Sequence, residues 1–259
     1  MADLSYEGQM TLSYIMHLEQ ALALNPPGKK GLRTRERIKI STARMLEARG
    51  FHALRVIDIT DDANIAEGSF YVYFKDKHEA SIAVLSGLLL EFLDFSGSVP
   101  DDPSAFAAIR AANRRWISVC RSNSGLMRCV LQISDGEPQF GGLAQQSNRQ
   151  WYERVADSVI RRRGGNRGGV LMAVYLLGSM MDELARKLVI YPDPELYKLL
   201  GELQADDTAV ADAASVMWLR VLYPDERPSD DLPPAAAQLA DILWPEPKAR
   251  RSSRIDDAV

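Results

Sequence analysis

The sequence predicts an all-α fold with two helical domains. Apolar residues recur at helical spacing through most of the chain, in segments that Pro and Gly residues separate. No segment shows the apolar and polar alternation of a half-buried strand, or a hairpin turn. The length of 259 residues suits about two domains, and a hydrophobic content of 46% is ordinary for a globular chain that buries its own core.

These signals divide the chain into four segments. We expect an N-terminal extension, a helix-turn-helix domain, a larger helical domain and a C-terminal tail, at residues 1–32, 33–80, 81–225 and 226–259. The extension contains a possible amphipathic helix from Met10 to Leu24, which an Asn-Pro-Pro-Gly sequence ends. The tail contains a possible short helix from Pro234 to Leu243, and its basic cluster, Lys248 to Arg254, fits a mobile solvated end.

The second segment opens with a helix from about Thr34 to Arg49. Ile38, Thr42 and Met45 recur there at helical spacing. Gly50 follows, at the point where a helix end favours a residue with positive φ.

A tight turn and a reading helix come next. A short apolar helix around Val56 to Ala63 precedes Asn64, a residue type that accepts positive φ at low cost, so we place the turn there. Small residues around the turn let the next helix, about Glu67 to Phe74, cross closely, as a helix-turn-helix requires. Phe70 and Phe74 are expected to face inward.

This segment resembles the N-terminal DNA-binding domain of the TetR family of bacterial transcriptional repressors. The ordered set of matching motifs covers about fifty residues, and the rest of the chain matches in size and helical character alone. The matching motifs are Thr34–Ile38, Arg49–Phe51, Asp58–Thr60, Gly68–Phe74 and Lys77–Glu79.

The resemblance implies a ligand-responsive repressor. Such a protein binds a palindromic operator in double-stranded DNA as a homodimer, and a small, largely hydrophobic effector releases it. We expect no enzyme activity and no cofactor, because the sequence shows no catalytic constellation, and a small-molecule enzyme on a helical domain is the disfavoured alternative. The alternative is a helical sensor or adaptor of the same fold that has lost specific DNA binding.

Eight residues are the expected DNA contacts. The recognition helix supplies phosphate or base contacts, the start of the following helix supplies a phosphate contact, and a basic arm precedes the domain. They are Arg33, Arg35, Arg55, Glu67, Ser69, Tyr71, Tyr73 and Lys77. The basic arm has a second interpretation, as a solvated linker.

Two positions depart from the family pattern. Arg55 and Ala66 stand where the family usually places Ser or Thr as N-caps, and each missing cap costs about 1 kcal/mol. Glu67 stands where relatives often have a basic residue. Its carboxylate either accepts from a cytosine amino group or complements the helix dipole.

The distribution of charge also indicates that the helix-turn-helix domain is the part that binds DNA. Residues 29–79 contain 11 Lys and Arg against 8 Asp and Glu, a local balance of +3, whereas the whole chain has a net charge of -4. A basic excess on the small domain supplies attraction to phosphates. An ordinary solvated face is the alternative when charge is considered alone.

The third segment reads as a series of helices. We expect them at about Asp76–Phe95, Pro103–Ser122, Leu126–Ser134, Gly142–Arg163, Arg167–Ile190 and Thr208–Leu222. The resemblance implies that the last two long helices pair with their copies in a dimer. The interface candidates are Val170, Val174, Leu177, Met181 and Leu184, for which monomer core is the alternative.

Bulky residues of these helices form the predicted effector pocket. Aromatic rings and adaptable sulfur-containing side chains with a few polar tips suit a hydrophobic or aromatic ligand, although each residue taken singly is more often plain core. The candidates are Trp116, Cys120, Met127, Trp151, Tyr152, Met172, Tyr175 and Met180.

Other chemistries find little support. His17, His52 and His78 are the only histidines, none at metal-ligand spacing, and we expect no catalytic residue, metal or cofactor. Cys120 and Cys129 indicate a reducing compartment, with a redox switch as the minor alternative. No signal peptide is visible and the longest apolar run is too short to span a bilayer, so we expect a cytoplasmic protein with no membrane partner.

Overall fold

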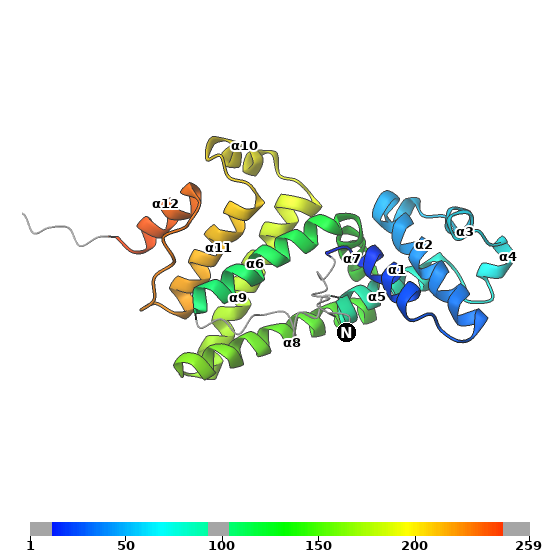
Figure 1. Cartoon of the computed structure of the whole chain (residues 1–259), viewed down its shortest axis with the longest axis horizontal. Coiled ribbons are helices and arrows are strands. Elements are labelled where there is room, and N and C mark those ends of the chain that lie inside the picture. The colour runs from blue at the N-terminus through cyan, green and yellow to red at the C-terminus, as the bar shows by residue number, and fades with distance from the viewer. Residues whose placement is uncertain (1–11, 93–103, 246–259) are drawn as a thin grey trace, which may run out of the picture.

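The computed structural model describes residues 12–92 and 104–245, and within these ranges every regular element is helical (Figure 1). The all-α prediction is confirmed. The N-terminal half contains α1 (Tyr14–Leu24), α2 (Lys30–Ala53), α3 (Val56–Ala63), α4 (Glu67–Phe70), α5 (Lys77–Gly87) and a π-helical turn η1 (Leu88–Phe92). The rest contains α6 (Ala105–Ser122), α7 (Ser124–Gly136), α8 (Pro138–Arg163), α9 (Arg167–Ala185), η2 (Arg186–Ile190), α10 (Pro194–Glu202), α11 (Asp207–Leu222) and α12 (Pro234–Leu243).

The two turns of the helix-turn-helix occur where the sequence placed them. Gly50 has φ 76° and breaks the regular helix near the end of α2. Asn64 is left-handed, with φ 50° and ψ 57°, and ends α3. Phe70 and Phe74 are both buried in the core, as predicted.

Other boundaries differ from the prediction. The recognition helix is a single turn, Glu67–Phe70, followed by turn residues up to Phe74. Such a short helix gains little from its own backbone hydrogen bonds. The buried side chain of Phe74 anchors the end of the segment, where the sequence had predicted a further helical turn. The sequence also missed α10, whose start Asp193 caps with its side chain ahead of Pro194. The predicted starts at Met10 and Pro103, and the end at Phe95, lie outside the described residues.

Two hydrophobic cores hold these helices. The first joins α1 to α5 with buried residues of α7 and with Phe140 at the start of α8. The second joins α6, α8, α9, η2 and α11, and α12 packs against it through partly buried apolar residues. The helix-turn-helix therefore shares its core with α7 and is continuous with the larger domain.

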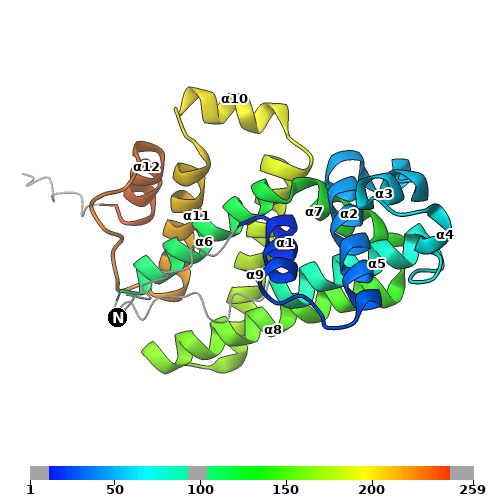
Figure 2. The ribbon, with the colours of Figure 1, turned by 45° about the vertical axis from the view of Figure 1, so that its right-hand side comes forward.

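Helix α1 lies between the two parts of the molecule (Figure 2). The buried side chain of Asn123, at the turn between α6 and α7, accepts the backbone N–H of Tyr14 at 2.8 Å and donates to the carbonyl of Leu12 at 2.7 Å. On the other side, Glu19 pairs with Arg44 of α2 at 2.6 Å. The predicted amphipathic helix thus connects the helix-turn-helix to the α6–α7 corner.

The apolar residues of α9 proposed for a dimer interface divide into two groups. Val174, Leu177 and Met181 are buried in the second core, and Val170 and Leu184 are partly buried against it. The three buried residues belong to the monomer core, so their assignment to an interface is wrong. For Val170 and Leu184, which are partly exposed, the interface stays a prediction. The face that α9 leaves exposed carries Met172 and Leu176, at 63% and 66% exposure.

The segment Arg167–Ile190, which is α9 with η2, is long and apolar enough to cross a membrane by length and composition alone. It is one such helix within the described ranges, and a core helix of a soluble protein passes the same test. Its buried residues pack against α6, α8 and α11 in the second core.

Candidate nucleic-acid interface and effector site

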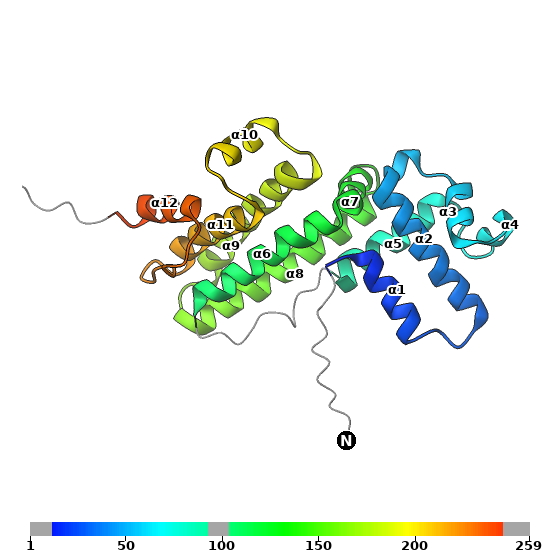
Figure 3. The same cartoon turned by 45° about the horizontal axis from the view of Figure 1, so that its top comes forward.

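The reading segment lies at the outer end of the molecule. Helix α4 and the turn after it stand at the end opposite α12 (Figures 1 and 3). Glu67 is exposed at the start of α4, Ser69 is half-buried, and Tyr71 is 53% exposed. Val72, which sequence reasoning did not select, is 76% exposed beside Tyr71. These side chains form one surface that is free to meet a groove of DNA.

The caps predicted to be missing are missing. Arg55 and Ala66 are the N-cap residues of α3 and α4, and neither side chain bonds to its helix. Arg55 instead makes two hydrogen bonds to Asp58, at 2.9 and 2.7 Å, and Arg49 pairs with the same carboxylate at 2.8 Å. The hydrogen bonds from Arg55 and then those from Arg49 lower the pKa of Asp58 to about 2. Asp58 therefore holds both arginines at the N-terminal end of α3.

Several predicted contact residues are engaged inside the domain. The guanidinium of Arg33 donates to the carbonyls of Pro27 and Gly28, at 2.8 and 2.9 Å. Arg35 lies over the Phe74 ring, 4.8 Å from its centre. The half-buried Tyr73 packs on the first core, close to Gly31 of α2. Arg35 and Tyr73 hold the reading segment against α2, whereas Arg33 closes the loop between α1 and α2.

Lys77 also has internal partners. Its ammonium donates to the carbonyl of Leu54 at 2.7 Å and reaches those of Phe51 and His52 at 3.4 Å. A lysine in this position satisfies carbonyls left open at the end of α2. Lys75, exposed and two residues earlier, is a cation that sequence reasoning missed. The signal for it was a lysine directly after the aromatic motif.

The predicted effector residues are only partly brought together. The rings of Trp151 and Tyr152 on α8 are 5.5 Å apart between centres, Tyr152 is 4.6 Å from Tyr175 of α9, and Trp151 is 5.9 Å from Trp218 of α11. Cys120 is buried in the same core, and Trp116 and Met127 pack on it. Met172 lies on the exposed face of α9, and Met180 is half-buried.

Asp182 lies at the centre of this cluster, and sequence reasoning did not select it. Tyr152 donates its hydroxyl to the Asp182 carboxylate at 3.3 Å. Burial raises the pKa of Asp182 to about 6. Burial also raises the pKa of the Cys120 thiol, with a further contribution from the Asp182 charge. The acidic pair Asp182–Glu183, directly after an apolar run, was the available signal.

The two thiols are buried and free. Burial raises the pKa of Cys129 to about 11, and that of Cys120 is raised too. Thiols in this state react slowly with oxidants, so neither residue favours the redox alternative. Within the described ranges no group of three or more His, Cys, Asp or Glu side chains is arranged to hold a metal ion.

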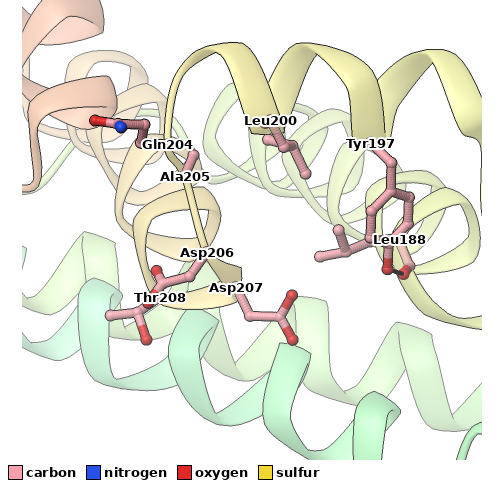
Figure 4. A pocket seen from close by; sticks show the side chains of 9 residues that line it. Leu188, Tyr197, Leu200, Gln204, Ala205, Asp206, Asp207 and Thr208 are labelled. Atoms are coloured by element: carbon pink, nitrogen blue, oxygen red, sulfur yellow. Dashed lines mark hydrogen bonds between the residues drawn. The ribbon is translucent and has the colours of Figure 1, made fainter.

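A surface hollow of about 660 Å³ lies elsewhere, between η2, α10 and the start of α11 (Figure 4). Tyr197, Leu200 and Asp207 are among the residues that line it, and none of the predicted effector residues does. Arg121 of α6 closes one side through two hydrogen bonds to Asp207, at 2.8 and 2.7 Å. The hollow is open and shallow, and its walls are held by this ion pair.

Comparison with known proteins agrees with the geometry of the reading segment. Residues 41–79 match the family described as bacterial regulatory proteins, tetR family. Nineteen chains of solved structures are similar. One of them is the fatty acid degradation regulator FadR from Bacillus halodurans, with a TM-score of 0.55 and 12% sequence identity over 74% of this chain and 96% of that chain.

No curated protein matches the sequence. At 12% identity the likeness to the solved regulator supports the fold alone. The matched residues run from the middle of α2 through α3 and α4 to the start of α5 and include both turns. Residues 41–79 therefore contain the DNA-binding domain that the tetR family of bacterial regulatory proteins has, which supports a role in transcriptional regulation.

Proposed function

We propose that the chain is a ligand-responsive repressor that acts in the cytoplasm. It binds a palindromic operator as a homodimer, and a small, largely hydrophobic effector releases it. The observation that carries this proposal is the exposed reading surface of Glu67, Ser69, Tyr71 and Val72, on a domain of the tetR family. No element of the described residues covers that surface.

The reading surface has a definite chemistry. Tyr71 offers a hydroxyl and a ring, and Val72 offers an apolar contact for a thymine methyl group. Glu67 is an acceptor for a cytosine amino group. Lys75 and Arg55 lie on either side of this surface along the chain and supply phosphate contacts. Arg35, Tyr73 and Lys77 position the segment through the internal contacts described above, and Arg33 closes the loop between α1 and α2.

A second copy of the chain fits the exposed face of α9. Met172 and Leu176 form an apolar surface there, beside the partly exposed Tyr175. Two reading heads must lie one turn of B-DNA apart, about 34 Å, to enter successive major grooves. A dimer through this face leaves the two reading heads at the ends away from α12 and free to bind together.

An effector signal has a continuous path to the reading head. Arg128 of α7 donates to the carbonyl of Ile190 in η2 at 3.1 Å, and the start of α7 is capped by Glu47 of α2 at 2.9 Å. A ligand that moves α9 and η2 therefore moves α7 and, through the Glu47 contact, α2 with it. The ligand must bind the released arrangement more tightly than the DNA-bound one for the operator affinity to fall.

We propose domain limits that follow these contacts. The DNA-binding domain covers 33–80, and the effector and dimerisation domain covers 81–225. Helix α12 is added to the latter because Ala236 is buried and Asp231 pairs with Arg110 of α6 at 2.9 Å.

The test is a fluorescence-anisotropy titration of the full chain against the DNA upstream of its own gene, at two salt concentrations. Tyr71→Ala should weaken palindrome-dependent binding by at least tenfold. Lys75→Ala should weaken binding to all sequences and lower the salt slope by about one. Lys198→Ala, an exposed lysine of α10, is the matched control and should change nothing.

Weak binding that is indifferent to sequence and to Tyr71→Ala would reject the repressor. It would favour a helical sensor or adaptor of the same fold. Loss of binding in the Lys198→Ala control would show that the change reports net charge and not the reading surface.

A further inference from the structure

We propose that Asp182 and the aromatic rings around it form the recognition point for a cationic effector, an alkyl- or arylammonium compound. This inference rests on the proposed function, because it names the chemical class of the effector. It starts from a side chain that the core of the domain does not need.

Asp182 has no cationic partner. Its carboxylate accepts a hydrogen bond from the Tyr152 hydroxyl, at 3.3 Å, and within the described ranges no Lys, Arg or His forms an ion pair with it. Asp212, a fully buried aspartate of the same domain, behaves differently. Asp212 pairs with Arg110 and Arg114 at 2.8 and 2.6 Å. A partly buried carboxylate that water reaches poorly and that lacks a counter-charge is unfavourable, and a bound cation would supply the missing charge.

The backbone of α9 builds a place for that cation. Tyr175, Gly178 and Asp182 are three and four residues apart, so they lie on one face of the helix. The Tyr152 ring from α8 lies directly over Gly178, where an added Cβ would come within 2.2 Å of the ring. Glycine is required at 178 for the ring to reach Asp182 and Tyr175 at the same time.

The rings supply the rest of the recognition. Tyr152 and Tyr175 are 4.6 Å apart between centres and inclined by 56°, and Trp151 adds a third ring 5.5 Å from Tyr152. Aromatic faces around a carboxylate bind ammonium groups through cation–π attraction and ion pairing together. The opposite charge fits poorly, since an anionic head group would meet the Asp182 carboxylate.

The site also contains an unused donor. The indole N–H of the buried Trp218 has no hydrogen-bond partner among the described residues. Its ring lies 5.9 Å from that of Trp151. Buried polar groups are nearly always satisfied, so an acid without a cationic partner and an unsatisfied donor among neighbouring rings are typical of a ligand site. An ammonium compound that also carries a hydroxyl or carbonyl would satisfy both.

The experiment uses the full chain and two probes that differ only in charge, phenyltrimethylammonium and its neutral carbon isostere tert-butylbenzene. Binding is followed by the fluorescence of the tryptophans in the cluster and by calorimetry. The wild-type protein should bind the cation at least tenfold more tightly than the isostere. Asp182→Asn should remove that preference and leave the affinity for tert-butylbenzene unchanged.

A matched control is Asp157→Asn, because Asp157 of α8 is exposed and paired with Arg167 at 2.9 Å. It should keep the preference for the cation. Equal affinity of the wild-type protein for the two probes would overturn the proposal, even where Asp182→Asn fails to fold. So would a preference for the cation that survives in folded Asp182→Asn protein.

The two proposals fail separately. The probe titrations contain no DNA, so the charge preference stands or falls without the operator. A protein that prefers the cation through Asp182 but binds no operator would keep this site and reject the repressor. A protein that binds its operator but shows no charge preference would keep the repressor and reject the cationic effector.

Discussion

Glu47 of α2 caps the start of α7 through the backbone of Leu126. One carboxylate oxygen accepts the N–H of Leu126 and the other accepts that of Gly125, both at 2.9 Å. Asn123, the N-cap residue of α7, makes no side-chain bond to this helix. A residue from the DNA-binding domain therefore satisfies the open donors of a helix in the effector domain.

The fit at this joint depends on glycine. An added Cβ at Gly125 would lie 2.1 Å from the carbonyl oxygen of Glu47, which is backbone and cannot turn aside. Close contact and capping thus hold α7 in one position on α2.

We predict that Glu47→Ala lowers the free energy of unfolding by about 2 kcal/mol, because two amides lose a charged acceptor. In the proposed repressor the same change should weaken the effect of an effector on operator affinity. Urea unfolding gives the first quantity and anisotropy gives the second. Glu202→Ala, an exposed position at the end of α10, is the control and should stay within about 0.5 kcal/mol of wild type. Unchanged stability in Glu47→Ala would refute the capping role.

Asn123 gives the second prediction. Its buried side chain bonds to Leu12, Tyr14 and Val119, so Asn123→Ala leaves the Tyr14 amide without its acceptor. We expect a loss of about 2 kcal/mol and faster amide exchange throughout α1. Hydrogen-exchange mass spectrometry of residues 14–24 measures it. Asn148→Ala, exposed on α8, should leave exchange in α1 as it is. Protection in α1 that survives Asn123→Ala would mean that the core contact of Tyr14 holds the helix by itself.

Asp212 gives the third prediction. Its carboxylate is fully buried on α11 and pairs with Arg110 and Arg114 of α6, and these hydrogen bonds lower its pKa against the effect of burial. Asp212→Asn leaves two guanidinium groups with a weaker partner, and we expect a loss of about 3 to 5 kcal/mol. The pKa of Asp212 is lower in the folded chain than in the unfolded chain. The stability that this pair contributes is therefore fully present above the unfolded-state pKa and is lost as the pH falls through the folded-state pKa. Thermal unfolding of both proteins near neutral pH checks the size. A loss below about 1 kcal/mol would contradict it.

Much of the DNA-binding domain was predictable because local chemistry determines it. Gly50 and Asn64 mark turns that require positive φ, and Phe70 and Phe74 mark the buried side of the reading segment. Such signals depend on single residues and their near neighbours. They do not depend on what lies elsewhere in the fold.

The candidate sites were less predictable because tertiary partners decide them. From the sequence alone, Lys77 is predicted to contact a phosphate. In the folded chain its ammonium instead lies among three carbonyls from α2 and the turn that follows α2. Asp182 reads as an ordinary surface acid until α8 brings Tyr152 over Gly178. Residues such as Val174 fit a dimer interface and a monomer core equally well by spacing, and packing against α6 and α11 settles the matter.

Asp182 gives the last prediction, which concerns pH. Burial raises its pKa from the ordinary 3.8 to about 6 in the folded chain. Below the ordinary value the carboxyl is neutral in both states. As the pH rises from about 4 to about 6, the unfolded chain ionises first, so the folded state loses roughly 3 kcal/mol of stability. The groups that face Asp182 are Tyr152 and Cys120, and both stay neutral over this range because their pKa values are also raised.

Asp182→Asn removes this pH dependence. The stability of the variant relative to the wild-type protein should therefore increase as the pH rises. We expect the difference in unfolding free energy to shift toward the variant by up to about 3 kcal/mol between pH 4 and pH 7, and to level off above pH 7. Urea unfolding of both proteins at a series of pH values measures it, and taking the difference cancels the groups they share. A difference that stays constant with pH would show that the Asp182 carboxylate is solvated in the folded protein. In that case it would also lack the unpaired charge that draws a cation to the site.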